Sequence, residues 1–107
     1  MALKELNFTF KASAPKPLPV EWKHSGVVGS GDMEVLMEKA DLGGEVTAKV
    51  VTPVIGFDKV WEKVLGKFVE ETGLSDATIE INDNNATPII VSVRMRQALQ
   101  EAIKEAE

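Results

Sequence analysis

The sequence contains no cysteine and no tyrosine, and it has a single histidine among its 107 residues. Without cysteine the chain has no disulfide framework, no thiol nucleophile and no cysteine-ligated zinc or iron–sulfur site. With only His24 as an imidazole, this chain alone cannot assemble a histidine-rich metal site. We therefore predict neither a metal site nor a catalytic residue.

Positive charge is also scarce. The chain has 12 Lys and Arg against 17 Asp and Glu, for a net charge of −5. This balance argues against nucleic acid as a partner, because phosphate neutralisation needs a basic face. No apolar run approaches the roughly 20 residues that span a bilayer, and the first residues carry an acid and lack the apolar core of a secretory signal. We expect a cytoplasmic chain that does not bind membranes.

The composition that remains fits one folded unit. The hydrophobic fraction is 44% and the charged fraction is 27%, as in soluble globular domains. A chain of 107 residues is too short for two ordinary domains. We therefore treat residues 1–107 as a single domain.

Period-2 alternation dominates the first half of the chain. Apolar residues alternate over 6–11, over 33–38 and over 45–52, which predicts three strands with one buried face each. Turn residues at 41–44 suggest that the second and third strands form a hairpin. Residues 13–25 contain three prolines, so we predict an extended connecting loop there.

The second half begins with a helical pattern. Seven apolar residues between Phe57 and Val69 recur at i, i+3, i+4, i+7 and beyond, which predicts an amphipathic helix that stops at Gly73. Residues 78–83 alternate as a strand. Thr87 and Pro88 could cap a helix over 89–96, but β-branched residues alternate there, so we predict a strand, followed by a short helix from Gln97.

These elements follow the order β-ββ-α-ββ-α. Strands and helices with one apolar face each assemble most simply in two layers. The predicted fold class is α+β: a two-layer sandwich with a mainly antiparallel sheet of about five strands and two helices on one face.

A glycine-rich turn at 26–32 is the most distinctive local feature. A Rossmann loop would need a helix after its glycines and a Walker loop would end in Gly-Lys-Ser/Thr, and neither is present. What remains is Ser30 between Gly29 and Gly31, followed by Asp32. Flanking glycines permit unusual backbone angles and leave the hydroxyl unhindered, so another enzyme could reach it. On composition alone, Gly-Ser-Gly is also an ordinary turn.

Other polar residues carry weaker signals. We expect His24, in the proline-edged loop, to face solvent. Arg94 and Arg96 fall on the polar side of a predicted strand, where surface charges are common. A hydrolase built on Ser30 is disfavoured, because nothing in the sequence places the lone imidazole beside the hydroxyl.

Residues 27–36, with Gly29-Ser30-Gly31-Asp32 at their centre, resemble the attachment segment of the malonate decarboxylase acyl carrier (delta) subunit family. The resemblance continues through the helix near Phe57, Asp83, the Ala-Thr-Pro at 86–88 and the Val-Arg-Met-Arg run that follows. The related citrate lyase acyl carrier family has Ser-Ser-Asp at this element instead.

The resemblance implies a function. In that family the serine that corresponds to Ser30 carries phosphoribosyl-dephospho-coenzyme A through a phosphodiester, with Gly29, Gly31 and Asp32 supporting the attachment turn. The implied role is a non-catalytic carrier of acetyl and malonyl thioesters. The implied partners are the acyl transferase and decarboxylase subunits and the transferase that installs the prosthetic group. Asp83 is a possible contact for a partner or the prosthetic group.

One segment departs from the family pattern. Residues 82–85 read Asn-Asp-Asn-Asn, where the family resembles His-Asp-Phe-Gly. Asn85, at the expected glycine position, still tolerates a left-handed backbone. Two alternative functions stay open on the sequence: a citrate lyase acyl carrier, and an unmodified interaction module that uses its acidic helices to hold a complex together.

Overall fold

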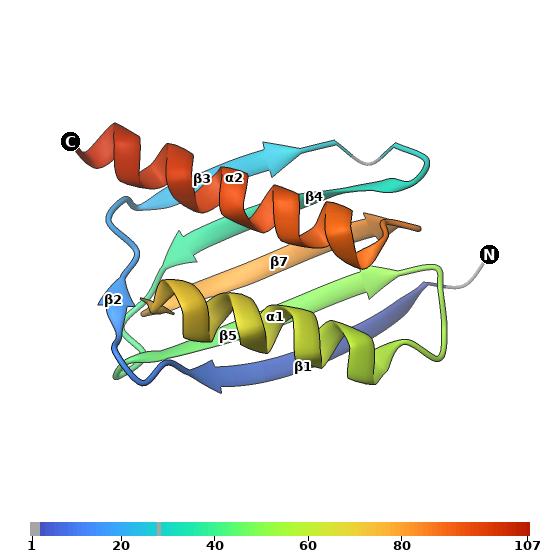
Figure 1. Cartoon of the computed structure of the whole chain (residues 1–107), viewed down its shortest axis with the longest axis horizontal. Coiled ribbons are helices and arrows are strands. Elements are labelled where there is room, and N and C mark those ends of the chain that lie inside the picture. The colour runs from blue at the N-terminus through green and yellow to red at the C-terminus, as the bar shows by residue number, and fades with distance from the viewer. Residues whose placement is uncertain (1–2, 28) are drawn as a thin grey trace.

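The computed structural model describes residues 3–27 and 29–107. Two helices pack side by side on one face of a five-stranded sheet (Figure 1). The sheet is formed by β1 (Lys4–Lys11), β3 (Trp22–Gly26), β4 (Asp32–Lys39), β5 (Glu45–Thr52) and β7 (Ala77–Asn84). The remaining elements are helices α1 (Asp58–Thr72) and α2 (Pro88–Ala106) and a short parallel pair, β2 (Lys16–Pro17) with β6 (Leu74–Ser75).

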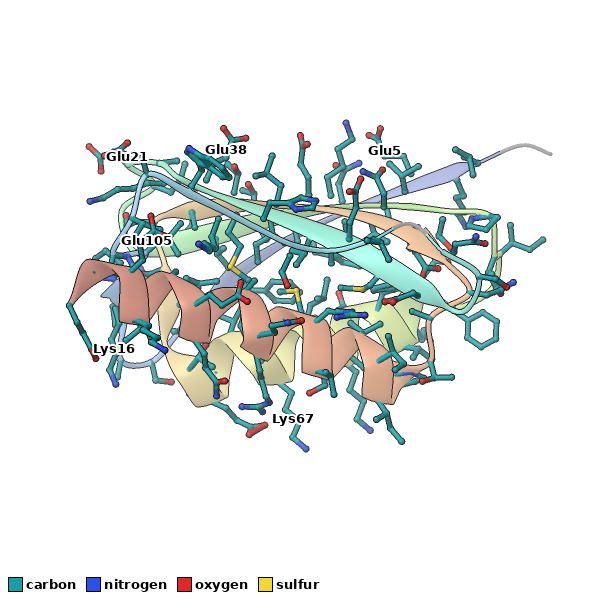
Figure 2. The ribbon with its side chains drawn as sticks, turned by 90° about the horizontal axis from the view of Figure 1, so that it is seen from above. Glu5, Lys16, Glu21, Glu38, Lys67 and Glu105 are labelled. Atoms are coloured by element: carbon teal, nitrogen blue, oxygen red, sulfur yellow. The ribbon has the colours of Figure 1, made fainter. Side chains whose placement is uncertain are left out.

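The strands lie in the order β1-β5-β7-β4-β3. Only β5 and β7 run parallel, and every other neighbouring pair in this sheet is antiparallel. Both helices lie on the same side of the sheet, while charged side chains such as Glu5 and Glu38 project from the other side (Figure 2). The predicted α+β two-layer sandwich is confirmed.

The predicted hairpin between 33–38 and 45–52 is wrong, because β7 lies between β4 and β5. The connection crosses the start of β7 and is held there by Asp76. Its carboxylate accepts the backbone N–H groups of Leu42 and Gly44, each at 3.1 Å, and its backbone oxygen accepts the N–H of Ala40 at 2.9 Å. The turn residues at 41–44 therefore form a crossover.

The predicted loop over 13–25 is only partly correct, because β3 begins at Trp22. The prolines end at Pro19, so every N–H of β3 is available for pairing. As an edge strand, β3 pairs with β4 alone, with Ser25 opposite Val35. The fifth strand of the sheet is thus in the first quarter of the chain.

The strand predicted over 89–96 is wrong, because these residues belong to α2. Thr87 is the N-cap, its Oγ1 accepts the Ile90 N–H at 3.3 Å, and Pro88 occupies the first helical turn. Five residues at helical spacing are buried against the sheet, whereas β-branched residues such as Ile89 and Val93 are exposed. The buried residues are Val91, Met95, Ala98, Leu99 and Ala102.

Helix α1 follows its predicted apolar stripe. Trp61, Leu65, Phe68 and Val69 are buried against the sheet. Gly73 ends the helix with φ +76° and donates its N–H to the Val69 oxygen at 2.8 Å. Beneath the helices, the strands contribute alternating apolar residues, among them Met33, Val35 and Met37 of β4. No helix among the described residues is long and apolar enough to cross a membrane.

Replacing Trp61 with alanine should lower the free energy of unfolding by about 3–5 kcal/mol, because its side chain is only 6% exposed and would leave a cavity. Chemical denaturation, monitored by far-UV circular dichroism, measures the change in the free energy of unfolding. Trp22→Ala is the matched control, because Trp22 is 61% exposed, and we expect it to stay within about 0.5 kcal/mol of the parent chain. Equal effects at the two positions would contradict the packing of α1.

Candidate functional site: the turn between β3 and β4

The glycine-rich segment 26–32 joins two paired strands. Gly26, the last residue of β3, lies opposite Glu34 of β4, so the predicted turn is the tip of a hairpin. The tip projects at the end of the sheet where both helices begin (Figure 1). Val28, part of the predicted turn, lies outside the described residues.

The backbone at the tip has a defined turn geometry. The Asp32 N–H donates to the Gly29 oxygen at 3.0 Å, which closes a four-residue turn with Ser30 in second position and Gly31 in third. Gly31 has φ +75°, as the third residue of a type II turn requires. Its N–H also donates to the Asn84 oxygen at 2.7 Å, at the end of β7. Ser30 is exposed on this anchored turn.

Asp32 fixes the turn to α2. Its carboxylate accepts two hydrogen bonds from Arg94, from Nε at 2.9 Å and from an Nη at 2.6 Å, and a third from the Met33 N–H at 2.7 Å. The Arg94 contact, followed by the Met33 N–H, lowers the pKa of Asp32 to about 2. Arg94 also donates a hydrogen bond to Gln97 Oε1 at 3.0 Å. The hydrogen bond to the Asp32 carboxylate raises the pKa of Arg94.

The sequence did not predict this ion pair. Once 89–96 is assigned to a strand, Arg94 becomes a surface charge. The signal that could have found it is the Thr87-Pro88 cap, which places Arg94 and Gln97 one turn apart on a single helix face. In the structure both partners are about three-quarters buried, with side-chain exposures of 27% for Arg94 and 21% for Asp32.

His24 lies on the uncovered face of the sheet, in β3 rather than in a loop. Its Nε2 is 2.9 Å from a Glu34 carboxylate oxygen, and Glu34 also accepts a hydrogen bond from Asn82 at 2.9 Å. Within the described ranges, the side-chain hydrogen-bond partner of His24 is thus Glu34 and not Ser30. No group of three or more His, Cys, Asp or Glu residues there could hold a metal ion.

Asp83 is buried, and both of its carboxylate oxygens accept hydrogen bonds. One carboxylate oxygen accepts the Thr52 hydroxyl at 2.8 Å, and the other accepts the Ala86 N–H at 2.9 Å. These bonds close the loop between β7 and α2. In this loop Asn85 has φ +66°, so it occupies the left-handed region expected of a residue at a glycine position.

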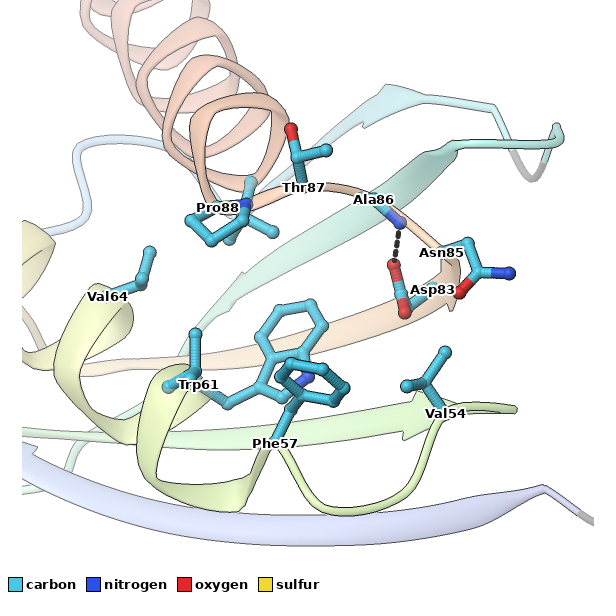
Figure 3. Close-up of a pocket in the computed structure, with 11 residues that line it drawn as sticks. Val54, Phe57, Trp61, Val64, Asp83, Asn85, Ala86, Thr87 and Pro88 are labelled. Atoms are coloured by element: carbon cyan, nitrogen blue, oxygen red, sulfur yellow. Dashed lines mark hydrogen bonds between the residues drawn. The ribbon is translucent and has the colours of Figure 1, made fainter.

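Asp83 also lies in the wall of a pocket of about 310 Å³ between the first turns of α1 and α2 (Figure 3). Its other walls are mostly apolar and come from the segment before α1, from α1 itself, and from the start of α2. They include Val54, Phe57, Trp61, Val64, Ala86 and Pro88. Sequence reasoning missed this pocket, because it exists only if α2 begins at Pro88.

The part of the chain that contains this site is similar to known proteins. The family model described as malonate decarboxylase delta subunit matches residues 21–102, a range that contains the turn, Arg94 and all the described residues that line the pocket. The chain belongs to the malonate decarboxylase delta subunit family.

Relatives of this delta subunit family match over most of the chain. "Malonate decarboxylase acyl carrier protein" of Malonomonas rubra is 54% identical, covering 98% of this chain and 93% of that protein. The protein of the same name from Stenotrophomonas maltophilia strain K279a is 36% identical, with 92% of each chain covered. A chain in the crystal structure of a Pseudomonas malonate decarboxylase hetero-tetramer in complex with malonate has a TM-score of 0.80 and 31% identity. The match covers 92% of this chain and 98% of that one.

The Asp32–Arg94 pair makes a pH-dependent contribution to stability. The pKa of Asp32 is lowered to about 2 in the folded chain, below the unfolded value of about 3.9. The contribution is therefore complete above about pH 4 and is lost as the pH falls toward 2. We expect Asp32→Asn to lower the denaturation midpoint at pH 7 and to reduce this acid-dependent loss. Midpoints that change identically with pH in the variant and its parent would contradict the pair.

Two glycine substitutions test the turn geometry. Gly31→Ala should lower stability by about 1 kcal/mol, because its φ of +75° disfavours any Cβ although the surrounding space is open. Gly29→Ala is the matched control, because its φ is not left-handed and its added Cβ would lie 3.9 Å from a Val27 methyl group, an ordinary contact. Denaturation midpoints measured in parallel distinguish the two, and equal losses would contradict the turn assignment.

Proposed function

We propose that the chain is a non-catalytic acyl carrier subunit of malonate decarboxylase whose prosthetic group, phosphoribosyl-dephospho-coenzyme A, is attached to Ser30 through a phosphodiester. The observation that supports this most directly is the exposure of Ser30 at the tip of a hairpin that is anchored to both β7 and α2. An anchored, exposed hydroxyl is what a modifying enzyme needs in its substrate.

The residues at the tip fit such a group. Gly31, beside Ser30, has open space where a side chain would lie, with no atom within 4 Å of an added Cβ. The Arg94 guanidinium pairs with the carboxylate of Asp32, two residues after Ser30 in the chain, so a phosphodiester on Ser30 does not face an unpaired Asp32. The absence of cysteine is compatible with a working thiol that belongs to the prosthetic group.

In the attachment step, the chain is the substrate of another enzyme. The Ser30 oxygen forms a bond to a phosphorus of an activated donor, the bond from that phosphorus to its phosphate leaving group breaks, and the hydroxyl proton passes to a base of the transferase. Held on Ser30, the group would supply the thiol on which acetyl and malonyl groups are carried as thioesters.

The partners in this proposal are the acyl transferase and decarboxylase subunits and the prosthetic-group transferase. The similarity to a chain of the Pseudomonas malonate decarboxylase hetero-tetramer supports an assembly with other subunits. The net charge of −5 suits protein partners with basic surfaces better than nucleic acid. The cytoplasm is the compartment that we expect for this assembly.

The intact mass of the protein tests the attachment. Coexpressed with the candidate transferase, the chain should gain the mass of one phosphoribosyl-dephospho-coenzyme A unit, and peptide mapping should place it on Ser30. The Ser30→Ala variant should fold with unchanged stability, to within about 0.5 kcal/mol, and should gain no mass.

Ser13→Ala is the matched control, because Ser13 is an exposed serine outside the turn. It should be modified like the parent chain. An unmodified parent chain in the presence of an active transferase would contradict the proposal and would favour an interaction module. A large loss of stability in Ser30→Ala would assign Ser30 a structural role instead.

A further inference from the structure

The pocket between α1 and α2 lies next to the proposed attachment site. The Gly31 N–H, one residue from Ser30, donates to the oxygen of Asn84, and the next residue, Asn85, lines the pocket. The path from Ser30 to the rim thus consists of one hydrogen bond and two Cα–Cα steps of about 3.8 Å each. The long flexible arm of a coenzyme A derivative exceeds that distance. Figure 3 shows the pocket beside the end of β7, with Asn85 at its edge.

The residues that line the pocket favour a neutral ligand over a negatively charged one. Phe57, Trp61 and Val64 of the α1 side face Ala86 and Pro88 across the cavity (Figure 3), and the lining residues that the structure describes include no lysine or arginine. Among the described residues that line the pocket, Asp83 is the only acidic one, and both of its carboxylate oxygens already accept hydrogen bonds, from Thr52 and from Ala86. An apolar wall favours a neutral ligand, whereas a second carboxylate here would be desolvated beside Asp83 with no cation to compensate it.

We propose that this pocket binds the neutral, acetyl-bearing end of the arm attached to Ser30 and excludes the malonyl-bearing end. The inference rests on the proposed function and adds a binding site within the chain itself. The acetyl thioester is sheltered from water in the pocket between reaction cycles. The malonyl thioester, whose free carboxylate is repelled by Asp83, stays outside and is available to the partner subunits.

The test uses the unmodified full-length chain with soluble S-acetyl-pantetheine and S-malonyl-pantetheine as probes. The readout is the indole N–H signal of each tryptophan in ¹H–¹⁵N NMR, because Trp61 lines the pocket and Trp22 is exposed outside it. The acetyl probe should shift the Trp61 signal saturably and leave the Trp22 signal unchanged. Millimolar affinity is sufficient, because tethering gives an effective concentration of about that order. The malonyl probe should bind at least tenfold more weakly.

Two variants, each with a matched control, connect the signal to the pocket. Phe57→Ala removes a half-exposed aromatic side chain from the pocket wall and should weaken binding of the acetyl probe several-fold. Its control is Ile103→Ala, because Ile103 is similarly exposed but lies at the far end of α2, and this variant should bind the acetyl probe like the parent chain. Asp83→Asn should reduce the difference in affinity between the acetyl probe and the malonyl probe. Its control is Glu80→Gln, an exposed charge on the same strand. Circular dichroism verifies that each variant is folded.

Equal affinity for the two probes, or a Trp61 signal that does not respond to the acetyl probe, would overturn the proposal. Discrimination that is unchanged in folded Asp83→Asn would also overturn it. Because the probes are soluble, these outcomes do not depend on the modification of Ser30. Failure of the proposed function appears separately, as an unmodified intact mass, and would overturn the arm as the occupant even if the soluble acetyl probe binds.

Discussion

The ion pair between Asp32 and Arg94 is the contact on which the geometry of the candidate site depends. It joins the tip of a hairpin to a helix 62 residues later in the chain, with two hydrogen bonds of 2.9 and 2.6 Å. A bidentate guanidinium–carboxylate contact fixes orientation as well as distance. The tip is thus held in place although Ser30 itself is exposed. Partial burial of both side chains makes this pair less sensitive to salt than a fully exposed one.

The arrangement of layers determines where the chemistry can lie. Helices cover one face of the sheet, and the other face carries charged and polar side chains (Figure 2). The first turns of α1 and α2 and the end of β7 lie at the same end of the sheet, and the β3–β4 hairpin projects from that end (Figure 1). One end of the molecule therefore holds both an exposed hydroxyl and an apolar pocket, and the loop at Asp83 links them.

The sequence predicted those features whose causes are local. The stripe from Phe57 to Val69 predicted α1, and the glycines around Ser30 predicted a turn that leaves the hydroxyl accessible. Asn85 adopts the left-handed conformation expected from its place in the motif. Each of these predictions needs only the periodicity of neighbouring residues or the backbone freedom of one residue.

What the sequence did not predict depends on contacts between distant segments. β-branched residues over 89–96 favoured a strand, but burial of Val91 and Met95 and the cap at Thr87 determined a helix. The crossover at 41–44 depends on Asp76, more than thirty residues away, whose carboxylate accepts hydrogen bonds from Leu42 and Gly44. The pairing of Arg94 and the burial of Asp83 follow from the same tertiary arrangement.

The central position of β7 has a consequence for when the molecule becomes functional. β7 is the last strand in the chain, yet both β4 and β5 pair with it, so the sheet cannot close until residues 77–84 have been synthesised. Such non-local pairing slows folding, because loop closure precedes any stabilising contact. Of the two anchors of the Ser30 turn, Asn84 is the last residue of β7, and Arg94 is made later still. The Ser30 turn is therefore fully anchored only after the residues up to Arg94 have been synthesised.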